Sequence, residues 1–288
     1  MISVLVPAYN EAASVGDTVA ALQRMLVSRG APFEIIVIDD GSTDTTAAEA
    51  EKAGAQVVRH PANVGYGNAL KTGIRAARYD WIATIDADGT YAAEDLSRLL
   101  DFIPQFDLVV GARSGPHFWG SIVKQPMRRI FLWLSEFVTG RTIPDVNSGL
   151  RVFGKRIAQA HFDRISGGFS FSTTLTLAML LEGRFVKYVP IGYRARVGKS
   201  RVRLVRDSLR AAQIIVQAIA YDNPIKLFVL LALFSSAATL LATAAFWLAG
   251  ARLLAGVVLW AGLLFALLVL GIGCLTDAVR SRTPRLDR

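Results

Sequence analysis

Trp81-Ile82-Ala83-Thr84-Ile85-Asp86-Ala87-Asp88 is the stretch of sequence that decides the fold. A run typical of a buried β-strand ends in two carboxylates that stand one residue apart. Such a pair forms a compact oxygen site, which suits Mg²⁺ or Mn²⁺ held jointly with substrate phosphates. We therefore expect a strand over 81–85 that brings Asp86 and Asp88 to the rim of a sheet.

A second apolar strand with the same ending lies upstream, where Ile35-Ile36-Val37-Ile38 precedes Asp39-Asp40-Gly41-Ser42. Carboxylates at the carboxyl ends of two strands of an α/β sheet mark the place of a ligand crevice. Asp-Gly pairs also make turns and helix caps, so either motif alone leaves both explanations open. The two motifs together favour a binding site.

Strand-like and helix-like segments alternate over the first 112 residues. This pattern predicts an α/β fold with a doubly wound, mostly parallel sheet. The strands are expected at 2–6, 35–38, 56–59, 81–85 and 108–111, and the helices at 11–28, 42–52, 67–77, 95–103 and 124–139. The last helix is basic and aromatic, which fits either a half-buried helix or a membrane interface.

Two C-terminal runs without a charged residue, 227–251 and 253–276, are each long enough to cross about 30 Å of hydrocarbon as a helix. Only Arg252 separates them, so a transmembrane hairpin is more plausible than two buried helices of a soluble protein. The N-terminus lacks the basic region of a signal peptide, and basic residues flank the hairpin on both sides. We expect a multi-pass membrane protein with a cytoplasmic domain over 1–200, an interfacial juxtamembrane helix over 201–224, membrane helices over 225–250 and 253–276, and a basic cytoplasmic tail over 277–288.

Charge divides the chain into an acidic and a basic part. Residues 1–112 carry 8 Lys or Arg against 15 Asp or Glu, whereas residues 113–210 carry 18 against 5. No helix-turn-helix, finger or aromatic-stacking motif accompanies the basic part, so no nucleic-acid partner is expected. Anionic headgroups of a lipid bilayer, or a phosphorylated lipid, suit it better. The single cysteine, Cys274, excludes an internal disulfide and a cysteine–metal framework.

Several motifs, taken in order and spacing, resemble the family 2 glycosyltransferases, which have the nucleotide-sugar-binding A-type fold. They are Val6-Pro7-Ala8-Tyr9-Asn10-Glu11, Asp39-Asp40-Gly41-Ser42-x-Asp44, Asn63-Val64-Gly65-Tyr66-Gly67-Asn68-Ala69 and Asp86-Ala87-Asp88. Two further motifs resemble the polyprenyl-phosphate branch, similar to dolichol-phosphate mannose synthase: Asp145-x-Asn147-Ser148-Gly149-Leu150-Arg151 and Arg196-Val197-Gly198-Lys199-Ser200-Arg201. The resemblance covers about residues 1–205. Many members carry Gln where this chain has Thr90, so Thr90 or water would take its place beside the metal.

The resemblance implies a site for a nucleotide diphosphate sugar. Its residues would be Pro7, Tyr9, Glu11, Val37, Asp39, Asp40, Asp86, Ala87 and Asp88. Tyr9 would pack near the base, or else be a core aromatic, and Asp39 would accept hydrogen bonds from the nucleoside. Asp86 would contact the ribose or the outer ligands of the metal, and Asp88 would ligate Mg²⁺ or Mn²⁺ directly. Gly65-x-Gly67 resembles a phosphate cradle, but the entry to a helix explains it better.

The basic part would hold the phosphate of the acceptor. A polyprenyl phosphate is ionised at neutral pH, so it needs charge neutralisation and alignment rather than a strong base. The implied ligands are Arg113, Arg128, Ser148, Arg196, Lys199 and Arg201. Asp145 would orient the acceptor or the metal, or would fix the turn before Asn147. The expected catalytic set is Asp86, Asp88, Arg113 and Asp145.

We therefore expect an inverting, metal-dependent enzyme that moves one hexose from a GDP-mannose- or UDP-glucose-type donor to a polyprenyl phosphate. Transfer to a neutral lipid hydroxyl, with Asp145 as the base, stays open, as does a non-catalytic membrane subunit with a degenerate fold. A processive polysaccharide synthase is disfavoured, because Gln125-Pro126-Met127-Arg128-Arg129 lacks the Trp of its acceptor motif. A homo-oligomer is left open, since self-association would enlarge a two-helix anchor.

Overall fold

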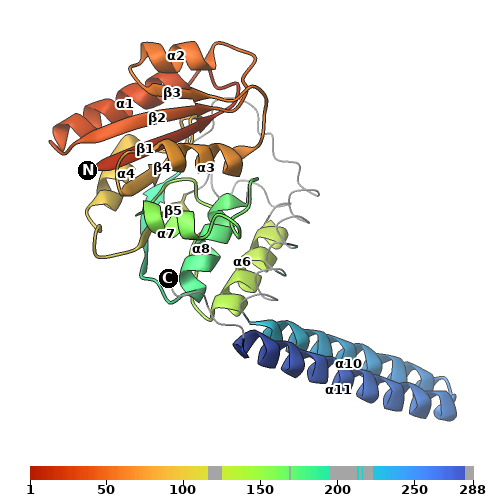
Figure 1. The fold of residues 1–288 in the computed structure, drawn as a ribbon. Coiled ribbons are helices and arrows are strands. Elements are labelled where there is room, and N and C mark those ends of the chain that lie inside the picture. Colours follow the sequence, from red (N-terminus) through yellow and green to blue (C-terminus); the bar gives the residue numbers. More distant parts are fainter. Residues whose placement is uncertain (116–124, 169, 195–212, 214–215, 217–222, 283–288) are drawn as a thin grey trace. The chain divides into compact units, whose positions relative to one another are not determined.

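The computed structural model describes residues 1–115, 125–168, 170–194, 213, 216 and 223–282. The chain divides into two compact units, Met1–Ile214 and Ile215–Arg288 (Figure 1). Almost all of the expected juxtamembrane helix, 201–224, lies outside the described residues, as does the end of the tail from residue 283.

The first unit is built on one seven-stranded sheet with the order β3-β2-β1-β4-β6-β5-β7. The antiparallel strand is β6, and the other neighbouring pairs are parallel. The strands are β1 (Ile2–Ala8), β2 (Phe33–Asp39), β3 (Gln56–Arg59), β4 (Trp81–Thr84), β5 (Leu108–Ser114), β6 (Arg151–Gly154) and β7 (Val186–Gly192). The predicted α/β fold with a mostly parallel sheet is confirmed.

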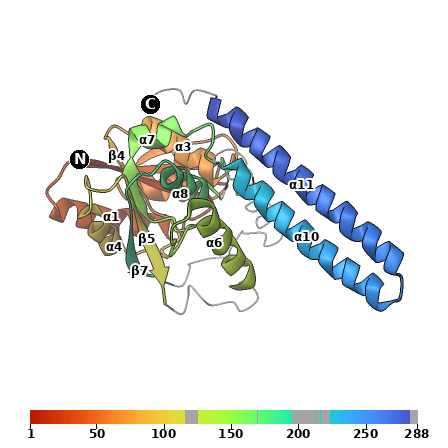
Figure 2. The same ribbon diagram turned by 90° about the horizontal axis from the view of Figure 1, so that it is seen from below.

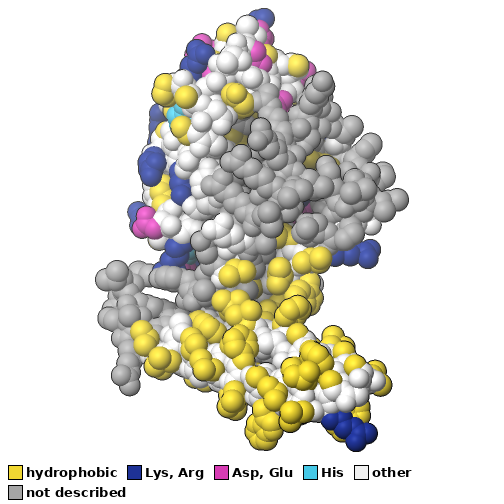
Figure 3. Space-filling view, turned by 90° about the vertical axis from the view of Figure 1, so that its right-hand side faces the viewer, with side chains coloured by type: hydrophobic (Ala, Val, Ile, Leu, Met, Phe, Trp, Pro, Cys, Tyr) yellow, Lys and Arg dark blue, Asp and Glu magenta, His cyan; other side chains and the backbone are white. Residues whose placement is uncertain are grey.

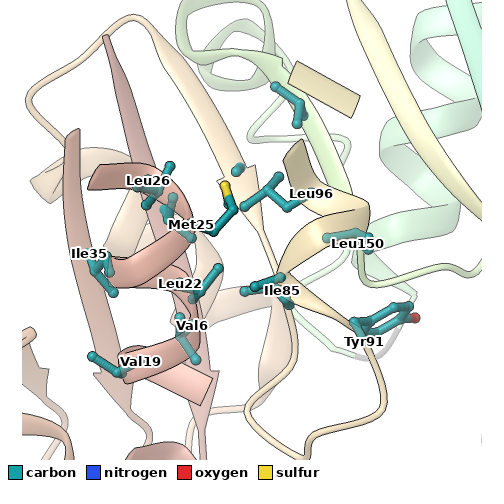
Figure 4. Close-up of a cluster of buried hydrophobic side chains, with 14 of the residues drawn as sticks. Val6, Val19, Leu22, Met25, Leu26, Ile35, Ile85, Tyr91, Leu96 and Leu150 are labelled. Atoms are coloured by element: carbon teal, nitrogen blue, oxygen red, sulfur yellow. The ribbon is translucent and has the colours of Figure 1, made fainter. Parts of the chain in front are cut away.

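Helices cover both faces of this sheet, as Figure 2 shows. One face carries α1 (Val15–Ser28) and α4 (Ala93–Leu100), and their apolar side chains form a core with the inward residues of the strands (Figure 4). The other face carries α3 (Tyr66–Ala76), α7 (Lys155–Ala160) and α8 (Phe171–Leu181), with a second core. The remaining helices of this unit are α2 (Thr46–Lys52) and α6 (Gln125–Thr139).

The register of the strands explains why the polar residues in the loops after β1, β2 and β4 lie at one edge of the sheet. The interior strand β1 pairs in parallel with both β2 and β4, with Ala8 opposite Asp39 and Leu5 opposite Thr84. Parallel strands end on the same side, so the loops after β1, β2 and β4 are neighbours. This edge therefore receives the polar residues that follow all three strands.

The predicted strands and helices of the first 112 residues are present, and so is the helix expected over 124–139, which forms α6. The first helix begins at Val15 rather than Glu11, because Glu11 starts a turn in which its carbonyl accepts the amides of Ser14 and Val15. Four later elements were not predicted: β6, α7, α8 and β7. Helix α8 is buried on most sides and lacks the apolar periodicity of a surface helix, and β6 is only four residues long.

The second unit contains an antiparallel helical pair, α10 (Pro224–Leu248) and α11 (Arg252–Arg282). Both helices are long and apolar enough to span a membrane, and only 6% and 17% of their most apolar windows are buried. Hydrophobic side chains cover the face of the pair that Figure 3 presents. Close packing joins the helices, since a Cβ on Gly273 would lie 2.5 Å from Cβ of Phe228.

Candidate active site

Asp86 follows β4 and is held from two sides. The hydroxyl of Tyr66, at the start of α3, donates to its Oδ1 over 2.9 Å. Burial and the charge of Asp86 raise the pKa of Tyr66 well above its ordinary value, so the phenol keeps its proton and remains a donor. On the other side, a Cβ on Gly149 would lie 2.5 Å from Asp86 Oδ2. The carboxylate thus occupies space that only glycine at position 149 leaves open.

Asp88 is buried, with 6% of its surface exposed, and is oriented by the next turn of the chain. Its Oδ1 accepts the hydroxyl of Thr90 over 2.6 Å and the Thr90 amide over 3.2 Å. Thr90 itself is fixed, since its carbonyl accepts the amide of Arg194 over 3.0 Å. Thr90 therefore orients the second aspartate.

The two carboxylates after β2 have different surroundings. Asp39 is fully buried; its Oδ1 accepts the Ser42 amide over 2.9 Å, and its Oδ2 lies 3.2 Å from Nε of the largely exposed Arg59. Asp40 instead holds the loop before α3, because its oxygens accept the amides of Val64 and Gly65 over 3.0 and 2.9 Å. Nδ1 of His60 also lies 2.8 Å from Asp40 Oδ1. Asp39 thus lies beside the exposed Arg59, whereas Asp40 binds the backbone of the loop before α3.

The loops after β1 and β2 are tied together. The Asn10 amide donates to the Ser42 hydroxyl over 2.9 Å, and the Glu11 amide donates to the Thr46 hydroxyl over 2.8 Å. The Asn10 side chain in turn accepts a hydrogen bond from the Thr43 amide over 2.8 Å. Segments 32 to 35 residues apart in sequence are therefore tied together and form one wall.

The remaining donor-side candidates line this wall or support it. Tyr9 and Glu11 are half-buried at its surface. Pro7 and Val37 are buried within the adjacent strands, and Val37 belongs to the hydrophobic core beneath α1. Ala87 is also buried there, and its carbonyl accepts the Thr18 hydroxyl over 3.4 Å. The side chains of Val37 and Ala87 therefore pack in the core.

Arg113 and Asp145 form a buried, two-pronged ion pair. Nε and Nη2 of Arg113 lie 2.7 and 3.0 Å from the two oxygens of Asp145, and only 14% and 4% of the side chains are exposed. Burial opposes the charge on the guanidinium, but Tyr91 and Asp145 raise the pKa of Arg113 well above its ordinary value. The guanidinium also lies 5.3 Å from the ring centroid of Tyr193. Asp145 further accepts the Asn147 amide over 3.1 Å, so it both fixes the turn and holds Arg113.

Tyr91 joins the Asp88 turn to the segment 145–150. Its hydroxyl oxygen accepts the Gly149 amide over 2.8 Å and lies 3.5 Å from the buried Ser148 hydroxyl. Its ring packs edge-on against Tyr193, with centroids 5.6 Å apart. Tyr91 therefore fixes the backbone on which the Asp86 carboxylate rests.

Arg151 lies beneath the same segment and is fully buried. It donates to the carbonyls of Ser148 and Ser172 over 2.6 and 2.9 Å and to the Thr176 hydroxyl over 3.1 Å. Burial lowers the pKa of Arg151, while the nearby Tyr66 and Asp145 act in the opposite direction. The arginine thus fastens the Asp145–Leu150 segment to α8.

The glycines at the start of α3 serve helix entry, as the sequence favoured. A Cβ on Gly67 would lie 2.7 Å from the carbonyl carbon of Gly167, and the Asn68 amide donates to Gly167 O over 2.9 Å. This backbone therefore packs against the loop 166–168 and has a protein partner there.

Gly149 adjoins the Asp86 carboxylate, and Tyr91 contacts both Gly149 and Ser148. The Arg113–Asp145 pair joins the same segment through Asp145, while Asp88 is held by Thr90, the residue before Tyr91. The side chain of Arg128 and all of Arg196, Lys199 and Arg201 lie outside the described residues. Sequence reasoning missed roles for Tyr66, Tyr91 and Arg151. Tyr66 and Arg151 stood within quoted motifs, whereas Tyr91 follows the Asp86–Thr90 turn without any recognisable spacing.

The carboxylates of Asp86 and Asp88 suit a divalent ion that is shared with a phosphate-bearing ligand. Within the described residues, no three His, Cys, Asp or Glu side chains converge to form a complete metal cage. Asp86 and Asp88 instead offer hard oxygen atoms from one short turn, and both carboxylates are held by hydroxyl donors. Mg²⁺ is commonly bound by one or two carboxylates together with phosphates and water, so these residues fit such an ion.

The fold and this site define a member of a large class of sugar-transferring enzymes. Residues 3–162 match the family model "Glycosyl transferase family 2", and the chain belongs to this family. Glycosyltransferase AglJ of Haloferax volcanii is 30% identical over 97% of this chain and 94% of its own length. Dolichyl-phosphate hexose transferase of the same organism is 29% identical over 70% of this chain and 86% of its own. The resemblance to the polyprenyl-phosphate branch is confirmed.

A solved structure supports the same fold. Glucosyl-3-phosphoglycerate synthase from Mycobacterium tuberculosis, crystallised with Mn²⁺, UDP and glucosyl-3-phosphoglycerate, superimposes with a TM-score of 0.57. The alignment covers 76% of this chain and 79% of that one at 21% sequence identity. At this identity the similarity establishes the A-type architecture alone.

Proposed function

We propose that this protein transfers a single hexose from a nucleotide diphosphate sugar to a polyprenyl phosphate at the cytoplasmic face of a membrane, with inversion at the anomeric carbon. The observation that carries the proposal is the paired, oriented carboxylates Asp86 and Asp88 on a family 2 chain. The relative named dolichyl-phosphate hexose transferase supports the lipid phosphate as acceptor. Two helices able to span a membrane support the location.

The donor side would bind the nucleotide on the wall formed by the loops after β1 and β2. Tyr9 and Glu11 lie at its surface, and Asp39 would accept hydrogen bonds from the nucleoside. Asp86 and Asp88 would hold Mg²⁺ or Mn²⁺, as the Mn²⁺ and UDP in the mycobacterial synthase support. When bound, such an ion neutralises charge on the diphosphate leaving group.

The acceptor phosphate would attack as an oxyanion and would need no general base. This distinguishes it from a neutral lipid hydroxyl, for which Asp145 would have to accept a proton. Both oxygens of Asp145 already accept hydrogen bonds from Arg113, which disfavours that role. Arg113, Arg128, Ser148, Arg196, Lys199 and Arg201 remain the proposed phosphate ligands. Among them, Arg113 would have to share its guanidinium between Asp145 and the phosphate.

One assay tests this proposal. Membranes containing the protein are incubated with labelled GDP-mannose or UDP-glucose and polyprenyl phosphate, with Mg²⁺, with Mn²⁺ or with a chelator. We expect label in an acid-labile, organic-extractable lipid, only when metal is present and only with the native Asp88. A neutral glycolipid that resists mild acid would favour the hydroxyl acceptor. Absence of any product with all donors would favour a non-catalytic subunit.

A further inference from the structure

We propose that Arg59 is a specificity-determining residue for the base of the donor nucleotide and that, together with Asp39, it selects uracil. In this arrangement the Asp39 carboxylate accepts the N3–H of the base, and the Arg59 guanidinium donates to the neighbouring carbonyl oxygen O4. The inference rests on the proposed function, from which Asp39 takes its role at the nucleoside. It adds a second residue to that role and gives the identity of the base.

The strand register places Arg59 beside Asp39 on one face of the sheet. Arg59 is the last residue of the edge strand β3, and its register partner is Asp39, the last residue of β2. Residues two positions apart in a strand share a face, and Val57 and Val37 pack with the core beneath α1. The two charged side chains therefore lie side by side at the edge of the sheet where the loop after β2 begins.

The Asp39 carboxylate has one oxygen that can accept a hydrogen bond from a ligand. Oδ1 accepts the Ser42 amide over 2.9 Å, whereas the buried Oδ2 has no hydrogen-bond partner among the described residues. Nε of Arg59 lies 3.2 Å from Oδ2 but is not aligned for a hydrogen bond. A buried oxygen without a hydrogen bond is costly, so an N–H group of a ligand would be favoured there.

Arg59 is held more loosely than a structural arginine of this chain. Its side chain is 61% exposed, and Nη2 donates to the Ser42 carbonyl over a long 3.3 Å. Arg113, by contrast, is buried and binds both oxygens of Asp145 over 2.7 and 3.0 Å. A guanidinium has five N–H donors, so Arg59 can turn toward a ligand and donate to it at little cost.

A cavity of about 490 Å³ adjoins the guanidinium, between the loops after β2 and β3. The residues that line it are Gly41, Ser42, Thr43, Arg59, His60 and Pro61. In the part of the chain that the structure describes, no carboxylate side chain lines this cavity, so a carbonyl oxygen of a base would meet hydrogen-bond donors there. Arg59 both lines the cavity and lies against the carboxylate, and it therefore connects the two.

The chemistry of the pair selects one kind of base. Uracil has an N3–H donor beside the O4 acceptor, which matches a carboxylate oxygen beside a guanidinium. Cytosine has the reverse, an N3 acceptor beside an amino group, so both charged side chains would be left unpaired. Guanine has a matching N1–H and O6 but adds an amino donor, and Oδ1 of Asp39 is already bound by Ser42. One oxygen without a hydrogen bond therefore fits uracil, which has a single N–H on this edge.

Binding of free nucleotides tests the proposal without an acceptor or a transfer step. The purified full chain is titrated by calorimetry with UDP, CDP and GDP in the presence of Mg²⁺. The three ligands share the ribose and the diphosphate, so differences in affinity report the base alone. We expect UDP to bind at least about tenfold more tightly than CDP or GDP, because the other bases leave a polar group unpaired.

Two substitutions test the members of the pair separately. Arg59→Ala should weaken UDP binding about tenfold and leave CDP binding unchanged or stronger. Arg98→Ala, which breaks an exposed arginine–aspartate pair on α4, is the matched control and should change neither. In Asp39→Asn, the Ser42 amide keeps the carbonyl oxygen and the amino group takes the place of Oδ2, so the ratio of UDP to CDP affinity should fall about tenfold or more. The thermal midpoint without nucleotide verifies folding, and Arg59→Ala decides the test if Asp39→Asn is unfolded.

Three outcomes would overturn the proposal. GDP or CDP binding as tight as that of UDP would mean that the pair does not select uracil. Unchanged or tighter UDP binding in Arg59→Ala would mean that the arginine only covers Asp39. Absence of binding by all three nucleotides would contradict the proposed function as well. UDP-selective binding that depends on Arg59, without any glycolipid product in the transfer assay, would contradict the proposed function alone.

Discussion

The charged residues at the proposed donor end and at the proposed acceptor end of the candidate site have different partners. At the donor end, Asp86 and Asp88 are oriented by neutral hydroxyl groups of Tyr66 and Thr90. At the acceptor end, Arg113 is joined to a carboxylate and Arg151 to backbone carbonyls. Hydroxyl donors orient a carboxylate without neutralising it, whereas a salt bridge consumes the charge of both partners. Neutral hydroxyl groups therefore orient the two carboxylates proposed for the donor, whereas the arginines near the proposed acceptor site bind a carboxylate and backbone carbonyls.

Replacing Asp88 with Asn tests the donor end most directly. The substitution preserves the volume of the buried side chain but removes the negative charge proposed for the metal. We expect transfer to fall by about 10³-fold, which corresponds to roughly 4 kcal/mol of lost electrostatic stabilisation. Asp101→Asn, at an exposed site, is the matched control. Wild-type activity in Asp88→Asn would remove this residue from the metal site.

Breaking the Arg113–Asp145 pair should mainly affect stability. Asp145→Ala leaves a buried guanidinium without its carboxylate, which typically costs about 3 kcal/mol or more. We expect a lower thermal midpoint in a stability assay of the purified protein. Breaking the exposed Arg29–Asp101 pair with Asp101→Ala should change it little, because exposed pairs contribute about 0–1 kcal/mol. If Asp145→Ala and Asp101→Ala lowered the thermal midpoint equally, the buried Arg113–Asp145 pair would not have the stabilising role proposed here.

Gly149→Ala probes the contact between the two ends. The added methyl group would meet the Asp86 carboxylate, so either the carboxylate or the segment 145–150 must move. Overpacking of this kind costs about 2 kcal/mol, and we expect a loss of activity of roughly 30-fold. Gly192→Ala is the control, because a Cβ there would meet no atom of the described residues within 4 Å. Full activity in Gly149→Ala would show that the position of Asp86 is unimportant.

Tyr66→Phe should give the smallest effect, since it removes one hydrogen bond and leaves the ring in place. A hydrogen bond to a charged group contributes about 1.5 kcal/mol, so we expect roughly a tenfold lower kcat/KM. We also expect a higher metal concentration for half-maximal activity, which a purely structural defect would not produce. Tyr79→Phe, a half-buried tyrosine on another loop, is the control. An unchanged metal dependence would contradict the orienting role of Tyr66.

The sequence predicted the position of the aspartates after β2 and β4 better than the contacts around Arg113 and Arg151, for physical reasons. Strands β2 and β4 are apolar runs followed at once by aspartates, so local pattern alone locates Asp39, Asp86 and Asp88. The acceptor end depends on long-range contacts: Arg113 meets Asp145 across 32 residues, and Arg151 meets Thr176 across 25. The spacing of residues in the sequence does not predict contacts between such distant residues. Nor does it predict the short antiparallel strand β6, which begins at Arg151.

The loop that Asp40 holds ends one residue before the tyrosine that holds Asp86. Asp40 fixes the amides of Val64 and Gly65, and Tyr66 then reaches across to the carboxylate after β4. The consecutive residues Val64, Gly65 and Tyr66 thus connect the wall proposed for the nucleoside to the carboxylates proposed for the metal. Because these residues are consecutive, we expect a displacement of Asp40 to move Tyr66 and with it Asp86, so substitutions that change the choice of nucleotide should also change metal affinity.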